Sequence, residues 1–274
     1  MTLRAPKNMF DATQIPPFYQ KDFSNFQNKL NSFLNSDDQY FLPQKNGTKK
    51  DILFLGATHG DEKIGVDVLQ SLASNKSFDW LLANEKAFAT NKRFIDVDMN
   101  RRAPGDINAE QYESQRAAEL IRQFKNYNYI VDIHGSVANS GLFIIMTKLS
   151  FDDLLLALQF DIPNIVIWLP KEQKATGPLV QFANPGIEIE CGPKDSKKLR
   201  IELKQILDGF VTNYGKGIDK NNLKSKNIFW VYGKLENNKE KLVDFQKTII
   251  DDEEFYPLLV GEYGIGCYKM IKIH

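Results

Sequence analysis

Cysteine and long apolar runs are what this chain has least of. Its 274 residues include two cysteines, Cys191 and Cys267. These are too few for the disulfide framework of a small secreted protein or for a cysteine-rich metal site. No stretch approaches the roughly 18 apolar residues that cross a membrane, and the charged, proline-containing stretch 1–18 lacks the apolar centre of a secretory signal. We therefore expect a reducing, cytoplasmic location and no membrane partner.

Net charge is absent as well. Lysine and arginine total 35, and so do aspartate and glutamate, which leaves a formal net charge of zero. A chain-wide basic surface for nucleic acid is thereby excluded, as is an acidic tail. The hydrophobic share of 42% is ordinary for a soluble globular protein. The length allows one large domain, or a main domain with a smaller appendage.

Strand-like and helix-like segments alternate over most of the chain. Short apolar runs such as DILFLG at 51–56 are typical of parallel strands buried on both faces, whereas other segments repeat apolar residues at helical spacing. The predicted strands are 51–56, 87–90, 129–133, 142–146, 165–168 and 187–191, and the predicted helices are 21–34, 64–72, 109–124, 151–159 and 196–210. This order predicts an α/β fold with a mixed, mostly parallel sheet flanked by helices.

The last part of the chain has a different pattern. Three further strands are predicted at 228–232, 255–260 and 267–273, with no helix between them. The stretch 215–226, rich in glycine, lysine and asparagine, is the predicted linker to them. We expect three parts, namely an N-terminal extension with a helix at 1–50, a core at 51–215 and a small C-terminal β subdomain at 227–274.

Histidine is the scarce residue that carries chemistry. His59 and His134 each follow a predicted strand, and in open α/β sheets the loops at the carboxyl ends of strands form the ligand crevice. His59 and Glu62 are three residues apart on a turn that leads into a helix, so their side chains can converge. Two histidines and one glutamate with an open fourth position are a known catalytic zinc set. The alternative is a chance pair of surface side chains and an unrelated loop histidine.

Arginines are concentrated in the segment RFIDVDMNRR at 93–102. The planar guanidinium fork suits a substrate carboxylate or a developing oxyanion. The alternative is a solvated loop whose arginines form ion pairs with Asp96 and Asp98.

Two glutamates, Glu188 and Glu190, lie two residues apart in a predicted strand and so share one face of it. A carboxylate at the end of a strand beside a metal is a common general base in metal-assisted hydrolysis. The alternative places both carboxylates on the exposed face of an edge strand.

Four motifs now form one pattern. ATHGDE, RFIDVDMNR, VDIHG and EIECGP occur in this order between residues 57 and 193, over about half of the chain. They resemble the aspartoacylase and succinylglutamate desuccinylase family, which shares the zinc-carboxypeptidase fold. The β-rich C-terminal part resembles the family's second domain, which completes the site. Any one motif is weak, but four in order are specific.

The resemblance implies a role for each matching residue. It implies that one zinc ion is bound by the two histidines and the glutamate named above. Glu190 would be the general base and later the acid that protonates the leaving amine, with Glu188 as a neighbour. Arg93 would polarise the scissile carbonyl and stabilise the oxyanion. Asn100 and Arg101 would bind a carboxylate of the substrate's amino-acid part.

The sequence departs from the family where substrate carboxylates are recognised. The family has a tyrosine and an arginine before the catalytic glutamate's strand, whereas this chain reads KATGP at 174–178. Lys174 offers a point charge but no bidentate fork, which puts N-acetylaspartate in question as the substrate. The family's C-terminal tyrosine corresponds best to Tyr263, with Tyr268 as the second choice.

The function expected from the sequence is a zinc-dependent amidohydrolase that removes the acyl group from an N-acyl amino acid or a related small amide. One alternative is a zinc carboxypeptidase that acts on a peptide or a cell-wall fragment, because the fold does not fix the substrate. Another is a non-catalytic binding protein with the same fold, which would have no chemical need for Glu190 beside a complete ligand set.

Overall fold

The computed structural model describes residues 15–44, 50–74, 77–170, 176–236 and 241–274. In this part of the chain, ten strands form one sheet in the order β2-β1-β3-β6-β4-β5-β7-β10-β9-β8. The strands are β1 (Ile52–Gly56), β2 (Phe78–Leu82), β3 (Tyr129–Gly135), β4 (Gly141–Met146), β5 (Asn164–Ile167), β6 (Gly186–Gly192), β7 (Asn227–Leu235), β8 (Thr248–Ile250), β9 (Glu253–Leu258) and β10 (Cys267–Lys272). The helices are α1 (Gln20–Asn35), α2 (Lys63–Ser71), α3 (Glu85–Thr90), α4 (Tyr112–Phe124), α5 (Phe151–Leu158), α6 (Lys197–Asn213) and α7 (Lys220–Lys224).

The strand directions confirm the predicted mixed, mostly parallel sheet. Strand β1 pairs parallel to β2 and β3, β3 parallel to β6, and β5 parallel to β4 and β7. Strand β4 runs antiparallel to β6. At the other end, β7, β10, β9 and β8 pair antiparallel in succession. The C-terminal strands therefore extend the core sheet through the pairing of β5 with β7. The division of the chain into parts at 1–50, 51–215 and 227–274 stays a prediction.

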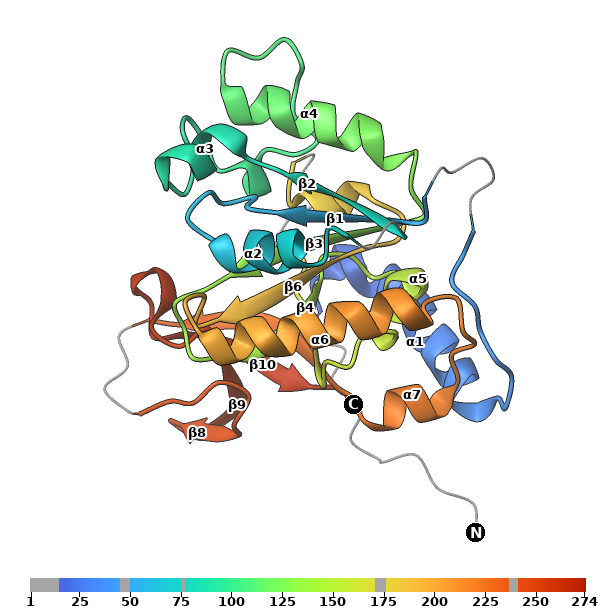
Figure 1. Cartoon of the computed structure of the whole chain (residues 1–274). Coiled ribbons are helices and arrows are strands. Elements are labelled where there is room, and N and C mark those ends of the chain that lie inside the picture. Colours follow the sequence, from blue (N-terminus) through green and yellow to red (C-terminus); the bar gives the residue numbers. More distant parts are fainter. Residues whose placement is uncertain (1–14, 45–49, 75–76, 171–175, 237–240) are drawn as a thin grey trace.

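Helices cover the central strands, and this explains their continuous apolar sequences. Every residue of β1 and β3 is buried, as expected of parallel strands packed on both faces. On one face, α2 and α6 lie side by side across the sheet (Figure 1). Residues of these two helices join those of α1 and α5 in the largest apolar cluster. On the opposite face, α4 packs in a second cluster, which includes Leu53, Leu55 and Ile130.

The structure corrects one predicted strand. Residues 87–90 belong to α3, because the side chain of Asn84 accepts a hydrogen bond from Ala87 N at 3.2 Å and caps the helix. Asparagine is a strong helix N-cap, and a strand pattern of only four residues does not override this helix signal. The neighbouring strand is instead β2, which begins at Phe78. The predicted linker 215–226 also contains a helix, α7, which begins with a capping box formed by Asp219 and Asn222.

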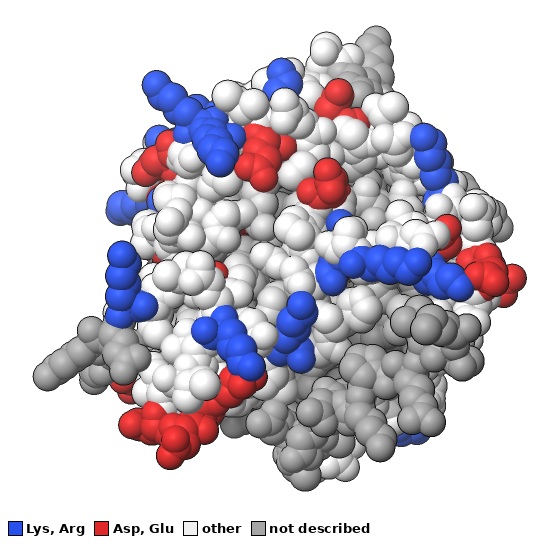
Figure 2. Space-filling view, turned by 90° about the horizontal axis from the view of Figure 1, so that it is seen from below, with Lys and Arg blue, Asp and Glu red and all other residues white. Residues whose placement is uncertain are grey.

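Charges of both signs are mixed on the face of the molecule seen in Figure 2. In the space-filling view, lysine and arginine side chains surround a largely uncharged central area, with acidic side chains between them (Figure 2). Neither sign covers this face. None of the described helices has the length and apolar character to cross a bilayer.

Candidate active site

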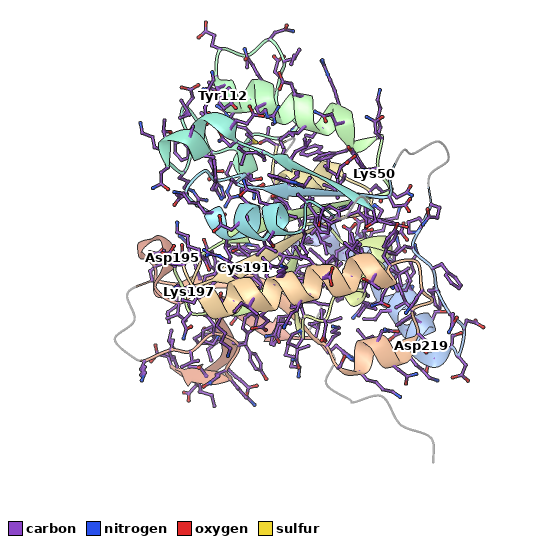
Figure 3. The ribbon with its side chains drawn as sticks, in the orientation of Figure 1. Lys50, Tyr112, Cys191, Asp195, Lys197 and Asp219 are labelled. Atoms are coloured by element: carbon purple, nitrogen blue, oxygen red, sulfur yellow. The ribbon has the colours of Figure 1, made fainter. Side chains whose placement is uncertain are left out.

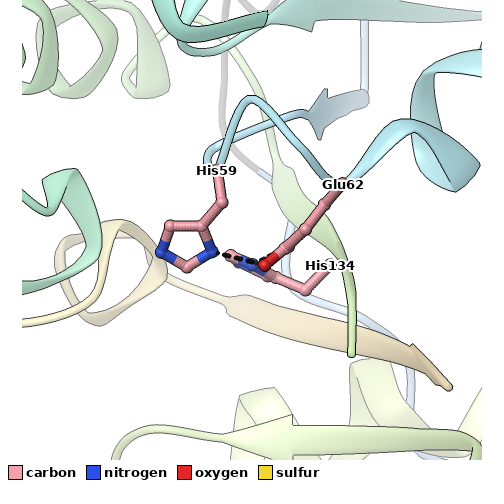
Figure 4. Close-up of side chains that lie close together, drawn as sticks. All are labelled: His59, Glu62 and His134. Carbon is pink, nitrogen blue, oxygen red and sulfur yellow. Dashed lines mark hydrogen bonds and ion pairs between the residues drawn. The ribbon is translucent and has the colours of Figure 1, made fainter. Parts of the chain in front are cut away.

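Three side chains converge at the carboxyl ends of β1 and β3 (Figure 4). His59 and Glu62 lie in the turn between β1 and α2, and His134 lies on β3. Nδ1 of His59 is 2.8 Å from Glu62 Oε1, and Nδ1 of His134 is 3.1 Å from Glu62 Oε2. All three residues are at most 3% exposed, so the structure brings the predicted ligand set together in the interior.

The turn that carries His59 depends on its backbone. Ala57 adopts a left-handed conformation with φ of 56°, which is uncommon for a residue with a side chain and occurs often at functional sites. Gly60 donates its N–H to Arg93 O at 3.1 Å. A Cβ atom on Gly60 would lie 2.1 Å from the backbone carbon of Ala87. Only glycine therefore allows the turn to lie against α3 and the segment that carries Arg93.

Each histidine also faces a second carboxylate. Nε2 of His59 lies 3.1 Å from Asp98 Oδ1, and Nε2 of His134 lies 3.0 Å from Asp132 Oδ2. Metal-binding histidines commonly have such a carboxylate on the nitrogen remote from the metal, which fixes the ring and its tautomer. With both Nδ1 atoms directed at one carboxylate, the donor set fits a zinc ion, which prefers imidazole nitrogen and carboxylate oxygen.

A second group of possible metal ligands shares His134 and consists of Asp132, His134 and Glu188. Both oxygens of Asp132 accept a hydrogen bond from Thr58 Oγ1, at 2.9 and 2.8 Å. Glu188 Oε1 accepts a hydrogen bond from Asn100 Nδ2 at 2.8 Å. Because these carboxylates already have partners, we assign them to orienting the site and not to binding a second ion.

The two glutamates of β6 face the same pocket. Residues Asp132 and His134 of β3 pair in register with Glu188 and Glu190 of β6. His134, Glu188 and Glu190 line a pocket with a volume of about 450 Å³. Strand β6 lies between β3 and β4, so the alternative of an exposed edge strand is wrong. The next side chain, Cys191, points to the other face and lies in the core beneath α6 (Figure 3).

Glu190 differs from Glu188 in its partners. Among the described residues, Glu190 Oε2 is buried without a hydrogen-bond partner, whereas Glu188 is held by Asn100. Removal from bulk water raises the pKa of Glu190 to about 8; His134 opposes this rise, and the charges of Glu62 and Glu188 add to it. A divalent cation beside Glu190 would favour its ionised form. Of the two glutamates of β6, Glu190 is therefore the one with an unpartnered oxygen.

Arg93 contacts the predicted ligand set and lines the same pocket. Its Nη1 donates to Glu62 Oε1 at 3.3 Å, and its Nη2 donates to Asp98 Oδ2 at 3.3 Å. The alternative predicted ion pairs of the arginines with Asp96 and Asp98. Arg93 does pair with Asp98, whereas Asp96 accepts a hydrogen bond from Tyr112 N. Arg93 nevertheless lines the pocket, which a solvated surface loop would not.

Asn100 and Arg101 also line the pocket, but they are held differently. Asn100 donates to Glu188 and accepts from Leu179 N at 3.1 Å, so it joins two walls of the pocket. The exposed Arg101 donates Nη1 to the carbonyl of Asn100. Of the remaining predicted residues, Lys174 and the side chain of Tyr263 lie outside the described residues, whereas Tyr268 lines the pocket.

Two buried acidic neighbours of the site, Asp132 and Glu113, were missed from the sequence. Asp132 has the same spacing to His134 that joins Glu188 and Glu190, and this spacing is the signal that could have found it. Glu113 of α4 is buried and accepts hydrogen bonds from the backbone N–H groups of residues 95, 96 and 97. It thereby holds the segment that carries Arg93 and Asp98.

Comparison with known proteins gives a consistent result. The family model for the succinylglutamate desuccinylase/aspartoacylase catalytic domain matches residues 48–214. A probable aspartoacylase of Prochlorococcus marinus (strain AS9601) is 31% identical over 167 residues, which cover 53% of this chain and 54% of that protein. The chain thus spans about half the length of the curated relatives that it matches first.

Solved structures agree in fold. Murine aminoacylase 3 superposes with a TM-score of 0.66 at 18% identity and covers 84% of this chain and 97% of that chain. The succinylglutamate desuccinylase of Chromobacterium violaceum has a TM-score of 0.58 at 18% identity and covers 89% and 96%. At this identity the similarity concerns the fold alone.

Proposed function

This chain belongs to the succinylglutamate desuccinylase/aspartoacylase family, and on that premise we propose that it is a zinc-dependent amidohydrolase that removes the acyl group from an N-acyl amino acid or a related small amide. One observation carries the proposal. The Nδ1 atoms of His59 and His134 converge on Glu62, and they do so beside the unpartnered oxygen of Glu190.

Zinc held by this ligand set would supply Lewis-acid polarisation of the substrate carbonyl. The protein's own residues account for the proton transfers. Glu190 takes a proton from the attacking water as the water oxygen bonds to the carbonyl carbon. It then passes that proton to the amide nitrogen as the C–N bond breaks, which releases a carboxylic acid and a free amine.

Arg93 and Arg101 supply positive charge at two points. Arg93 lines the pocket and contacts Glu62 and Asp98, and its guanidinium would donate to the oxyanion of the tetrahedral intermediate. Arg101 and the second N–H of Asn100 would bind the carboxylate of the amino-acid part. Lys174 and Tyr263 are proposed as further contacts to the substrate. The pocket of about 450 Å³ is in the range of small-molecule sites.

The test is a screen of N-acetyl and N-succinyl amino acids with zinc-loaded protein, read by amine release. We expect turnover that is lost when a chelator removes the metal and is regained with zinc. Glu190→Gln should lower kcat by about 10²-fold or more, because it removes the proton acceptor. The matched variant Glu188→Gln should have a much smaller effect.

Two results would contradict this function. Turnover that persists in metal-free protein, or in the Glu190→Gln variant, would exclude the mechanism. Cleavage of dipeptides without cleavage of any N-acyl amino acid would favour the carboxypeptidase instead. Protein that contains no zinc by elemental analysis after purification without chelators would favour the binding protein.

A further inference from the structure

The segment 91–98, which carries Arg93 and Asp98, has little of its own to hold it in place. It contains no helix or strand, and its two large apolar side chains, Phe94 and Ile95, are each 38% exposed. Packing of these side chains therefore contributes little to its position, since the gain from burial scales with the apolar area removed from water. The arginine and the aspartate nevertheless contact the predicted ligand set, so the segment needs an anchor from elsewhere in the chain.

The anchor is the side chain of Glu113, on the first turn of α4. Glu113 is fully buried, and its two carboxylate oxygens accept four hydrogen bonds. Oε1 accepts from Ile95 N at 2.6 Å and from Asn84 Nδ2 at 3.2 Å. Oε2 accepts from Asp96 N at 3.0 Å and from Val97 N at 3.2 Å. An ionised carboxylate has about four lone-pair sites and no donor, so it can satisfy all four N–H groups at once.

Asn84 extends this network to the turn that carries His59. Its backbone N–H donates to Ala57 O at 3.1 Å, and Ala57 is the left-handed residue two positions before the histidine. Its side-chain Oδ1 accepts from the first turn of α3. Glu113 is thus joined to both segments that build the site, the turn with His59 and the segment with Arg93.

Helix α4 itself does not reach the substrate. It lies alongside α3 at one end of the molecule, beyond β2 (Figure 1), and none of its described residues lines the catalytic pocket. Its first residue, Tyr112 (Figure 3), adds a second contact to the segment, because its N–H donates to Asp96 Oδ2 at 2.8 Å. An effect of Glu113 on catalysis therefore has to pass through the residues that it holds.

We propose that Glu113 is a positioning residue of the catalytic site, which fixes the backbone at 95–97 and so holds the guanidinium of Arg93 where the oxyanion develops. This inference rests on the proposed deacylase function. Its physical reason is that donors stabilise an oxyanion best when they are fixed in place before the reaction. An arginine on a segment without packing of its own is fixed only if its backbone is.

The first test is Glu113→Gln, which keeps the size of the side chain but replaces one acceptor oxygen by an NH2 group. That group would face N–H donors, so the segment has to move. With saturating zinc, we expect kcat for an N-acyl amino acid to fall about 10²-fold, a loss that a displacement of about 1 Å can cause. KM should change less than kcat.

A double-mutant cycle separates positioning from a general loss of structure. Arg93→Ala should by itself lower kcat by about 10²- to 10³-fold, as the removal of an oxyanion donor does. In that background Glu113→Gln should have little further effect, because the group that it positions is gone. Equal losses of kcat in both backgrounds, or an unchanged kcat in Glu113→Gln alone, would overturn the proposal.

Two control variants accompany the cycle. Glu119→Gln removes an exposed carboxylate of the same helix, which pairs with Arg116, and should leave kcat unchanged. Leu207→Ala removes a buried side chain of α6, and should lower the free energy of unfolding without lowering kcat. If Glu113→Gln does not fold, Glu113→Asp takes its place in the cycle with the same criteria, because it keeps both acceptor oxygens and withdraws them by one methylene.

Failure of the proposed function would be recognised separately. If the wild-type protein hydrolyses no N-acyl compound, the position of Arg93 is measured by NMR from its side-chain Nε–H signal, which is assigned by its loss in Arg93→Lys. Glu113→Gln should shift that signal more than Glu119→Gln does. A signal at the same position in the wild type and in Glu113→Gln would overturn the role of Glu113.

Discussion

At the scale of single residues, Asp132 is a buried carboxylate that depends on its hydrogen-bond and ion-pair partners. It is fully buried, accepts both hydrogen bonds from Thr58 and lies 3.0 Å from His134 Nε2. A buried carboxylate is costly without partners, and here the partners are a hydroxyl and an imidazole. The arrangement keeps His134 Nδ1 directed toward Glu62.

We predict that Asp132→Asn weakens zinc binding by about 10- to 100-fold, the usual effect of removing a partner of a metal-binding histidine. The measurement is competition with a chromophoric chelator. Asp79→Asn is the control, because Asp79 pairs with Lys50 on β2, away from the site. Equal zinc affinity in both variants would mean that Asp132 serves stability alone.

That His59, Glu62 and His134 lie together near Glu190 could be predicted from the sequence, because histidine is rare and the motifs are ordered; their roles as zinc ligands and general base stay predictions. The partners of these residues could not be predicted. Asp98 and Asp132 become partners of His59 and His134 only through the exact course of a loop and the pairing of β3 with β1 and β6, which local sequence does not encode. The roles proposed for Lys174 and Tyr263 stay predictions.

At the scale of elements, α5 is joined to the start of β6 by the buried Asp153, which also pairs with Lys148. Asp153 Oδ2 lies 2.8 Å from Lys148 Nζ, and Asp153 Oδ1 accepts a hydrogen bond from Gly186 N at 3.0 Å. Lys148 also donates to the carbonyls of Val180 and Ala183. The pair thus fixes the start of the strand that carries Glu188 and Glu190.

Asp153 makes the stability of the folded protein depend on pH, and the sign of this dependence follows from its pKa. Burial raises the pKa of Asp153 to about 6, although Lys148 opposes the rise. The folded protein therefore holds a proton that the unfolded chain, with a pKa of about 3.9, has released. The stability contribution is complete below about pH 4 and is lost as the pH rises through about 6.

We predict that, between pH 4 and pH 7, the free energy of unfolding of the wild-type protein falls by about 2–3 kcal/mol relative to that of Asp153→Asn. The measurement is urea unfolding at several pH values. Asp152→Asn, at the neighbouring and partly exposed position, should follow the wild type. Parallel curves for wild type and Asp153→Asn would show that Lys148 keeps Asp153 ionised.

The long, periodic or fully apolar elements were predictable, and the short ones were not. The segments 21–34 and 129–133 became α1 and β3 because their patterns extend over several turns or bury both faces. The segment 87–90 failed because a capping side chain outside it, Asn84, decided its conformation. Strand β8 has three residues, and only its pairing with β9 defines it.

At the scale of the whole molecule, one carboxylate adds a contact between the C-terminal strands and the loop after β3, beyond the pairing of β5 with β7. Glu262 lies between β9 and β10, and its Oε2 accepts hydrogen bonds from Val137 N and Ala138 N, both at 2.9 Å. These residues follow the strand that carries His134. Leu259 and Tyr268, which flank Glu262 along the chain, line the catalytic pocket.

We predict that Glu262→Ala lowers the free energy of unfolding by about 2–3 kcal/mol, since two backbone donors lose a charged acceptor, and that it raises KM more than it lowers kcat. Urea unfolding and steady-state kinetics measure the two effects. Glu254→Ala removes a carboxylate from an exposed ion pair with Lys247 and should change both little. An unchanged KM in Glu262→Ala would separate this contact from substrate binding.

The alternation of side chains along β6 has a consequence for how this protein can diverge. Glu188 and Glu190 face the pocket, while Ile187, Ile189 and Cys191 face the core. Insertion or deletion of one residue upstream in the strand would reverse which side chains face the pocket and which face the core. The glutamates would then enter the hydrophobic core, and the cysteine would face the pocket. Natural variants of this strand should therefore arise by amino-acid substitution. Insertions and deletions should be confined to the loops on either side.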